Sequence, residues 1–221
     1  GTGKELVART IHFNSDRKDQ PFVSVACGGI PEGLLEDDLF GHVAGAFQDA
    51  KADRQGRIEM ATGGTLFLDD VESLSPGLQA KVLRVLVDRE VFPLGSSEKV
   101  QVDVRVIAAT RSDLKAQVEQ GNFREDLYYR LNVIVIHLPE LRERGEDIPA
   151  LIHHFVHKYS REMGTPPARF TAEALKAMSE FPWPGNVREL ENVVERAVAL
   201  SRGREEITLE YLPPGFQEAG A

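Results

Sequence analysis

Short apolar runs alternate with helical patterns along the first 138 residues, and this alternation constrains the fold more than any other feature of the sequence. Four segments have the length and composition of buried strands: PFVSVAC (21–27), TLFLDD (65–70), DVRVIAAT (103–110) and VIVIHL (133–138). Helical patterns separate them, and the pattern after TLFLDD begins with a Ser75 cap and Pro76. Buried strands separated by helices predict an α/β fold with a mostly parallel sheet flanked by helices.

The pattern changes after Leu138, where the strand signal ends. Three helical segments follow, near residues 145–163, 171–181 and 187–202. We therefore expect an α/β subdomain over residues 1–139 and a small helical lid over residues 140–221. The length of 221 residues suits one large domain, or one domain with a satellite.

Composition excludes several classes of protein. The net charge of −9 argues against broad neutralisation of nucleic-acid phosphates by this chain, so DNA contact is expected in a domain outside it. The single Cys27 rules out an internal disulfide and suits a reducing compartment. No apolar run approaches the roughly 20 residues that span a bilayer, and no secretory start is present, so we expect a cytoplasmic protein without a membrane partner.

The chain opens with a glycine-rich turn that leads into a helical pattern. GTGKE, comprising Gly1, Thr2, Gly3, Lys4 and Glu5, is typical of the end of a phosphate-binding loop, in which backbone N–H groups face phosphates and the lysine reaches the outer ones. The full motif needs a glycine further upstream and has Ser or Thr where Glu5 stands. A glycine turn that only starts a helix remains the alternative.

Two acids end the apolar strand TLFLDD. The carboxyl edge of an open α/β sheet is where ligands bind, so Asp69 is expected to hold Mg²⁺ and Asp70 to orient an attacking water. Acids that only solvate the strand end are the alternative. The lysine upstream favours the functional interpretation.

Long motifs extend this interpretation: GTGKELVARTIH, PFVSVACGGIPEGLLEDDLFGH, GGTLFLDD, FREDLYYRLNV, LPELRERGEDI and WPGNVRELENVVERA. In this order they resemble the AAA+ P-loop domain of sigma-54-dependent transcriptional activators, the bacterial enhancer-binding proteins. The resemblance covers nearly the whole chain. It implies ATP hydrolysis with Mg²⁺ between subunits of a homo-oligomeric ring, a hexamer or heptamer. It also implies remodelling of the sigma-54 RNA polymerase holoenzyme, and DNA binding through a separate domain.

The same resemblance assigns a role to the small-residue stretch GHVAGAFQDA. Its residues Gly45, Ala46, Phe47, Gln48, Asp49 and Ala50 correspond to the family's GAFTGA loop, which contacts sigma-54. Phe47 would be the apolar tip pressed onto the partner, unless it packs locally. Gln48 and Asp49 depart from the family's Thr and Gly, and Asp49 would be strained if the position needs a positive φ.

Three further departures affect the expected catalytic site. Asp70 stands where the family has Glu, which shortens the reach to the water by about 1 Å. Ala26 stands where an Asn hydrogen-bonds that Glu and couples the nucleotide state to the loop. Arg111 replaces the Asn of the first sensor, and a cation there could meet a γ-phosphate with different geometry.

Three arginines match the family. Arg124 and Arg130 correspond to residues presented to the neighbouring subunit's ATP, and Arg188 corresponds to the second sensor, on the lid. A solvated helix face is the alternative for the first two.

His153 and His157 lie one helical turn apart, but no third ligand is evident, so we reject a metal site.

The strand that feeds a phosphate loop is central in such sheets, and the sequence starts after it, so we expect the native protein to extend upstream.

Two hypotheses remain open. The first is a ring-forming ATPase that remodels sigma-54 polymerase. The second is a nucleotide-binding and oligomerisation module of a transcription factor with weakened hydrolysis and without the sigma-54 contact.

Overall fold

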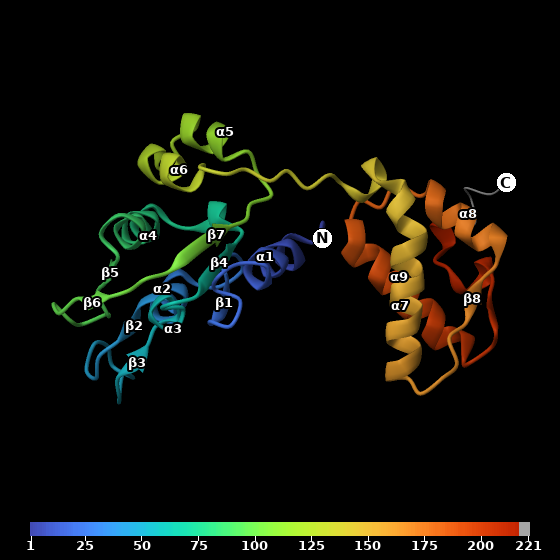
Figure 1. Ribbon diagram of the computed structural model, residues 1–221, viewed down its shortest axis with the longest axis horizontal. Coiled ribbons are helices and arrows are strands. Elements are labelled where there is room, and N and C mark those ends of the chain that lie inside the picture. Colours follow the sequence, from blue (N-terminus) through green and yellow to red (C-terminus); the bar gives the residue numbers. More distant parts are fainter. Residues whose placement is uncertain (217–221) are drawn as a thin grey trace. The chain divides into compact units, whose positions relative to one another are not determined.

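The computed structural model describes residues 1–216, which form two compact units. One unit spans Lys4–Ile136, and the other contains Gly1–Gly3 and the residues from His137 onward. Figure 1 labels most of the helices and strands of both units. The first unit holds the sheet with its helices, and the second is mainly helical.

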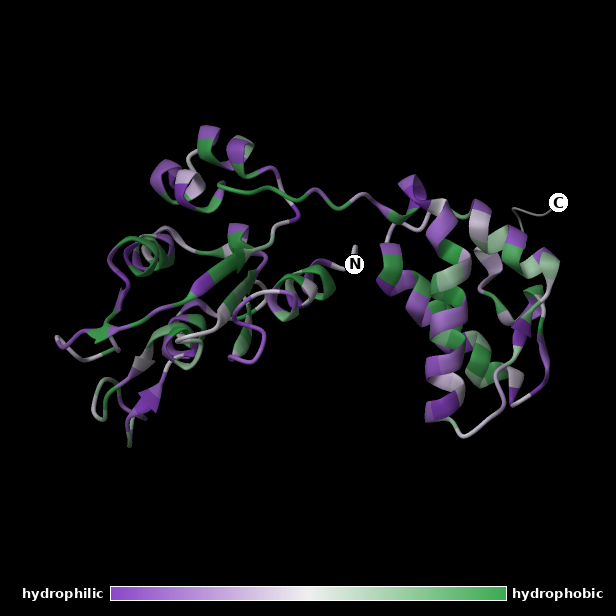
Figure 2. Cartoon of the chain, viewed as in Figure 1, coloured by the Kyte–Doolittle hydropathy of each residue, from purple (hydrophilic) through white to green (hydrophobic). Residues whose placement is uncertain are grey.

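The α/β unit is built on three parallel strands, β1 (Phe22–Ala26), β4 (Thr65–Asp69) and β7 (Arg105–Ala108). The order is β1-β4-β7, so β4 is the middle strand. Its first four residues are buried, as expected for a strand covered on both faces, and Figure 2 colours this strand largely hydrophobic. The predicted α/β class with a parallel sheet is confirmed.

Helices flank this sheet: α1 (Lys4–Phe13), α2 (Glu32–Phe40), α3 (Arg57–Met60), α4 (Pro76–Asp88), α5 (Leu114–Glu119) and α6 (Glu125–Leu131), with a 3-10 turn η1 (Val71–Ser73) after β4. The start of α4 follows its sequence, because Ser75 Oγ accepts a hydrogen bond from Leu78 N and Pro76 takes the first helical position. Arg89 ends the helix in a left-handed conformation. Leu78 and Val85 bury its apolar face in the core.

Two short antiparallel pairs were not predicted from the sequence. β2 (Gly41–His42) pairs with β3 (Arg54–Gln55), and β5 (Glu90–Val91) pairs with β6 (Val100–Gln101). Strands of two residues are too short for an alternating pattern to appear. Gly41 is required where β2 starts, since its φ is 71° and a Cβ there would lie 2.2 Å from the carbonyl oxygen of Arg54.

The predicted strand over residues 133–138 is wrong. These residues form no strand, and the side chains of Val133–Ile136 are between 55 and 84% exposed. Figure 2 colours this extended segment as hydrophobic. A strand exists only through hydrogen bonds to a neighbour, and no segment within residues 1–216 pairs with this one.

The helical unit contains α7 (Ile148–Glu162), α8 (Ala172–Glu180) and α9 (Asn186–Ser201), in agreement with the three predicted helical segments. Short 3-10 turns complete it: η2 (Leu141–Glu143), η3 (Gly145–Asp147), η4 (Leu209–Tyr211) and η5 (Pro214–Phe216). Trp183 belongs to its hydrophobic core, is 1% exposed, and donates its indole N–H to the carbonyl oxygen of Met178. The expectation that no strand follows Leu138 is wrong, because β8 (Arg169–Phe170) and β9 (Glu206–Ile207) form a short parallel pair.

Within residues 1–216, no helix combines the length and apolar character needed to cross a membrane.

Candidate functional site

The predicted phosphate-binding lysine lies at the start of a helix. α1 begins at Lys4, so the first backbone N–H groups of this helix have no partner within it. Lys4 is half-buried and makes no ion pair with the residues that the structure describes. Glu5 accepts hydrogen bonds from Arg9 one turn later, so its carboxylate is held on its own helix. A lysine ammonium and helix N–H groups together provide an environment for an anion.

The glycines before this helix belong to the other compact unit. Val187 N donates to the carbonyl oxygen of Gly1, and Arg144 donates to that of Thr2. Gly3 has a φ of 98°, a conformation that favours glycine, and a Cβ there would meet no atom within 4 Å.

The two predicted acids lie at the carboxyl edge of the sheet. Asp69 is the last residue of β4 and lies opposite Ala26 of β1, while its Oδ1 accepts a hydrogen bond from Asp70 N at 3.1 Å. Asp70 is left-handed, with φ 56° and ψ 50°, and leads into η1. Val71 N then donates to the carbonyl oxygen of Ala109, which ties the turn after β4 to the end of β7.

Arg111 lies beside Asp70. Its Nε is 3.0 Å from Asp70 Oδ1, and its backbone N–H donates to Glu72 Oε1 at 3.1 Å. The predicted first sensor and the predicted water-orienting acid therefore form an ion pair. Glu72 was missed by sequence reasoning, although it follows two acids at the edge of the sheet. Its Oε2 atom is buried without a hydrogen-bond partner in the part of the chain that the structure describes.

Cys27 lies next to these acids and is 2% exposed. Burial, together with the negative charges of Asp69, Asp70 and Glu72, raises the pKa of the Cys27 thiol to about 12. A thiol with this pKa stays protonated near neutral pH, so Cys27 is a core residue and not a nucleophile. Ala26, the residue before it, carries only a methyl group beside Asp69 and cannot hydrogen-bond either acid.

The two predicted intersubunit arginines lie at opposite ends of α6. Arg124 precedes the helix and forms a bidentate pair with Asp126, at 3.0 and 2.8 Å. Arg130 lies in the last turn and donates to the carbonyl oxygen of Leu86. Both side chains are exposed, and among the described residues their partners are Asp126 for Arg124 and Leu86 for Arg130. Gln79, fully buried on α4, was missed: its Oε1 accepts from Arg124 N at 2.7 Å and so fixes the start of α6.

The predicted second sensor, Arg188, lies in the first turn of α9 and is exposed. It makes no ion pair with the residues that the structure describes. The start of α9 is held by Asn186, whose Oδ1 accepts a hydrogen bond from Leu141 N at 2.7 Å. This fixed start gives the Arg188 backbone a defined position within the helical unit.

Residues 43–53 form the loop between β2 and β3 that carries the predicted partner contact. Gly45 N donates to the carbonyl oxygen of Ala50 at 2.8 Å, so Gly45–Ala50 form a closed turn. Phe47 is 45% exposed, and its ring makes a T-shaped contact with the His42 ring at a centroid distance of 4.9 Å. Asp49 does not have a positive φ, so the strain considered at this position is absent.

A second turn lies against this loop. Gly95, between β5 and β6, has a φ of 79°, and a Cβ there would lie 2.7 Å from the Cβ of Ala46. Val43 N donates to the carbonyl oxygen of Leu94 at 3.1 Å, and Leu94 N donates to that of Gly41 at 2.8 Å. The two turns are therefore joined by backbone hydrogen bonds.

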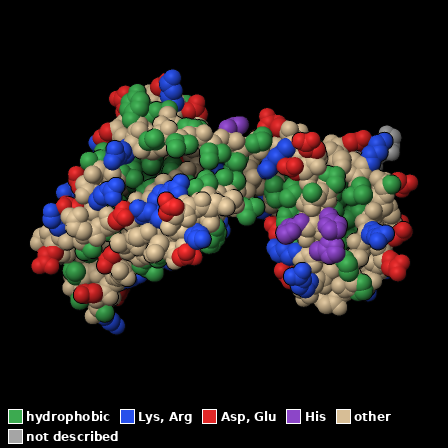
Figure 3. All heavy atoms as spheres, viewed as in Figure 1, with side chains coloured by type: hydrophobic (Ala, Val, Ile, Leu, Met, Phe, Trp, Pro, Cys, Tyr) green, Lys and Arg blue, Asp and Glu red, His purple; other side chains and the backbone are tan. Residues whose placement is uncertain are grey.

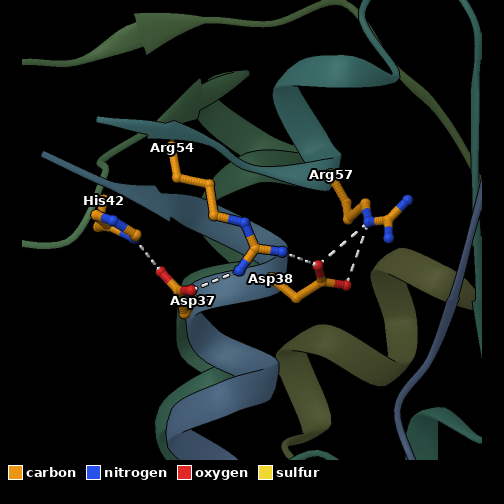
Figure 4. A network of polar contacts seen from close by, with 5 residues as sticks. All are labelled: Asp37, Asp38, His42, Arg54 and Arg57. Atoms are coloured by element: carbon orange, nitrogen blue, oxygen red, sulfur yellow. Dashed lines mark hydrogen bonds and ion pairs between the residues drawn. The ribbon is translucent and has the colours of Figure 1, made fainter. Parts of the chain in front are cut away.

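A network of charged side chains fixes the base of the loop (Figure 4). His42 Nδ1 lies 2.5 Å from Asp37 Oδ1, and Arg54 donates to Asp37 at 2.7 Å and to Asp38 at 2.8 Å. Arg57 Nε donates to Asp38 at 3.2 Å. Sequence reasoning missed this network, since paired acids on a helix read equally well as a solvated face.

The histidines of α7 gather on one face of the helical unit (Figure 3). The Nε2 atoms of His153 and His157 lie 3.1 Å apart, beside a cavity of about 450 Å³ with an apolar floor that includes Val156 and Phe170. Among the described residues, no group of three or more His, Cys, Asp and Glu is arranged to hold a metal ion.

Two family models match the chain. Residues 1–137 match the sigma-54 interaction domain, and residues 142–221 match the AAA+ ATPase lid domain. Among solved structures, NtrX from Brucella abortus, in complexes with ADP and with ATP, has a TM-score of 0.90 and 38% sequence identity. Each match covers 99% of this chain and 48% of that chain.

Curated relatives are more similar in sequence. The Nif-specific regulatory protein of Herbaspirillum seropedicae is 52% identical over 203 residues, which are 92% of this chain and 38% of the relative. The transcriptional regulatory protein ZraR of Escherichia coli strain K12 is 50% identical over 213 residues, which are 96% of this chain and 48% of the relative. The chain thus spans less than half of either relative. It belongs to the sigma-54 interaction domain family of AAA+ proteins, as its motifs predicted.

Proposed function

We propose that this chain is the ATP-hydrolysing AAA+ domain of a bacterial sigma-54-dependent transcriptional regulator and couples its nucleotide state to remodelling of the RNA polymerase holoenzyme. The observation that carries the proposal is the acidic carboxyl edge of the sheet. There Asp69 ends the buried middle strand and Asp70 follows it, in an α/β unit whose first helix begins at Lys4. The ATP and ADP complexes of the similar NtrX support the choice of nucleotide.

The residues present fit ATP and Mg²⁺. Lys4 is half-buried and unpaired among the described residues, so its ammonium is available for a phosphate. Asp69 offers a carboxylate at the edge where ligands of open α/β sheets bind. Mg²⁺, when bound, would neutralise charge on the phosphates. Lys4 would hold the outer phosphates, Asp69 would hold the metal and Arg188 would sense the nucleotide from the lid.

Asp70 would orient the attacking water and accept its proton. Its side chain is one methylene shorter than the family's Glu, and its Oδ1 already contacts Arg111. The shorter side chain lowers the expected rate, because a displacement of about 1 Å at the reacting group costs on the order of a hundredfold. We therefore expect slow hydrolysis.

Arg124 and Arg130 would act on the nucleotide of a neighbouring subunit in a homo-oligomeric ring of six or seven copies. Both are exposed at the ends of α6, and Arg124 would exchange its partner Asp126 for a phosphate. Such arginines contribute about 10³ to 10⁵ in rate when they engage. Turnover per subunit should therefore rise with protein concentration as rings form.

A second candidate function is a nucleotide-binding and oligomerisation module with weakened hydrolysis and no sigma-54 contact. The observation that favours it is the state of the partner loop. Phe47 packs against His42, and Gln48 and Asp49 replace the residues typical of the family. DNA binding would lie in a domain outside this chain in either case.

Two assays on the full-length protein separate these functions, with Lys4→Ala as the control that removes nucleotide binding. The first measures ATP turnover over a range of protein concentrations, and the second measures capture of sigma-54 in the presence of a transition-state analogue. Concentration-dependent turnover with capture supports the main proposal. Turnover without capture supports the second function. A protein that neither binds nor hydrolyses ATP would refute both.

A further inference from the structure

The ion pair between Asp70 and Arg111 joins two residues whose backbones are fixed. Asp70 is held at the start of η1, where Val71 N donates to the carbonyl oxygen of Ala109 at 3.1 Å. The backbone N–H of Arg111 donates to Glu72 Oε1, also at 3.1 Å. The turn after β4 and the turn after β7 are thus joined by one backbone–backbone hydrogen bond and by one bond from the Arg111 backbone to the Glu72 side chain. The Arg111 guanidinium is therefore held near Asp70 by the fold itself.

The residues beside Asp70 on the neighbouring strand and the loop after it, Ala26 and Gly28, offer its carboxylate no charged partner. A Cβ on Gly28 would lie 3.5 Å from Asp70 Oδ2, so the second carboxylate oxygen faces a residue with no side chain. Ala26, at the end of the neighbouring strand, has no polar side-chain atom. Among the described residues, Arg111 is the cationic partner of Asp70.

Arg111 is also placed to leave this pair. Its side chain is 67% exposed, whereas that of Asp70 is 24% exposed. An exposed ion pair is only weakly stabilising, so a stronger anion can displace the carboxylate. The guanidinium carries five N–H donors and binds phosphate oxygens in a bidentate fashion, and a terminal phosphate carries more negative charge than one carboxylate.

We propose that Arg111 is a positioning residue that moves from Asp70 to the terminal phosphate of a bound nucleoside triphosphate. In the absence of that phosphate, Arg111 occupies Asp70 Oδ1 and keeps the acid from a water. With the triphosphate bound, Arg111 contacts the phosphate and Asp70 is free to orient the water. A nucleoside diphosphate lacks the terminal group and leaves the pair closed. This inference rests on the proposed nucleotide site.

The inference predicts a coupling between Asp70 and the terminal phosphate that passes through Arg111. Asp70→Asn removes the competing charge, so it should tighten the binding of a non-hydrolysable ATP analogue about fivefold or more. ADP affinity should change less than twofold, since ADP does not reach Arg111. In an Arg111→Met background, the effect of Asp70→Asn on the analogue should fall to about twofold or less, the part due only to the charge of Asp70.

The experiment is a double-mutant cycle on the full-length protein, with affinities measured by calorimetry and folding checked by thermal unfolding. Asp103→Asn is the matched control, because Asp103 pairs with Arg17 and Arg89 and has no assigned part in the site. If Arg111→Met fails to fold, Arg111→Gln serves in its place. Equal effects of Asp70→Asn in both backgrounds, or equal effects on both nucleotides, would overturn the inference. A wild-type protein that binds neither nucleotide would instead overturn the proposed function, and the inference with it.

Discussion

Asp70 combines an uncommon backbone conformation with a short side chain. Its φ of 56° lies in the left-handed region, which Asp tolerates better than most non-glycine residues. A longer acid at this position would reach further toward a bound nucleotide, but it would fit the backbone less well. The conformation favoured by stability and the reach favoured by catalysis are therefore in conflict at this residue.

This conflict predicts two opposite effects of Asp70→Glu. ATP turnover by the full-length protein should rise about tenfold, because the carboxylate gains reach. The free energy of unfolding should fall by about 1 kcal/mol, because Glu is less tolerant of the left-handed conformation. Steady-state kinetics and denaturant unfolding measure the two effects. Asp70→Asn, which has no base, should abolish turnover, and a Glu variant with unchanged or lower turnover would contradict the assignment.

At the scale of elements, the loop between β2 and β3 combines an exposed aromatic with a charged base. Phe47 presents part of its ring to solvent, while His42 supports the other side. Asp37 holds His42 in turn and is 12% exposed at its side chain. A rigid base and an accessible tip are what a loop needs to press on a partner and transmit force.

Phe47→Ala should reduce capture of sigma-54 by about tenfold or more, because burial of a Phe side chain contributes about 1.5 to 3 kcal/mol. ATP turnover should stay within about twofold, since Phe47 does not touch the acidic edge. Phe13→Ala is the matched control, because Phe13 is also exposed, at 55%, but lies at the end of α1. Equal capture by wild type and Phe47→Ala would exclude this ring as the contact.

Asp37→Asn should destabilise the α/β unit by about 1 to 3 kcal/mol, because it removes a nearly buried charge that pairs with both His42 and Arg54. Chemical denaturation followed by circular dichroism gives this value. Asp103→Asn, which removes a carboxylate that is 53% exposed, should cost about 1 kcal/mol or less. A similar loss of stability in both variants would show that the burial of Asp37 does not increase its contribution to the free energy of unfolding.

The elements that the sequence predicted correctly are those with a local cause. β4 is a continuous apolar run, and α4 has its cap, its proline and an apolar face, so each could be identified without knowing its neighbours. The pairs β2–β3, β5–β6 and β8–β9 could not, because their strands are two residues long and exist through their partners. Residues 133–138 failed for the converse reason: the segment has strand composition but no partner among the described residues.

At the scale of the whole molecule, the proposed site needs residues from two subunits. In the full-length protein, neither Lys4→Ala nor Arg124→Ala should turn over ATP. Lys4→Ala removes the lysine that holds the phosphates, and Arg124→Ala removes the arginine supplied to the neighbouring subunit. Mixed in equal amounts, they should recover activity, because about a quarter of the interfaces in a random ring then join an intact site to an intact arginine. Turnover of the mixture against that of each variant alone measures this. An inactive mixture of well-folded rings would place Arg124 in its own subunit's site.

The positions of candidate site residues could be predicted where these residues belong to a sequence motif next to a strand. Asp69 ends β4, Asp70 follows β4 and Arg111 lies after β7, so their position at one edge of the sheet follows from the parallel topology. Glu72 and Gln79 were not predictable, because their roles depend on which backbone groups the folded chain leaves beside them. That Arg111 pairs with Asp70 also emerged only in three dimensions, since 41 positions of sequence offer no sign of contact.

The close approach of Gly95 to Ala46 has a mechanical consequence. A Cβ on Gly95 would clash with Ala46, and backbone hydrogen bonds of Leu94 with Val43 and Gly41 join the β5–β6 turn to the Phe47 loop. We therefore expect a displacement of either turn to displace the other. The position of Phe47 is thus coupled to a turn about fifty positions further along the chain. A partner or ligand that shifts residues 92–99 should also shift the aromatic ring.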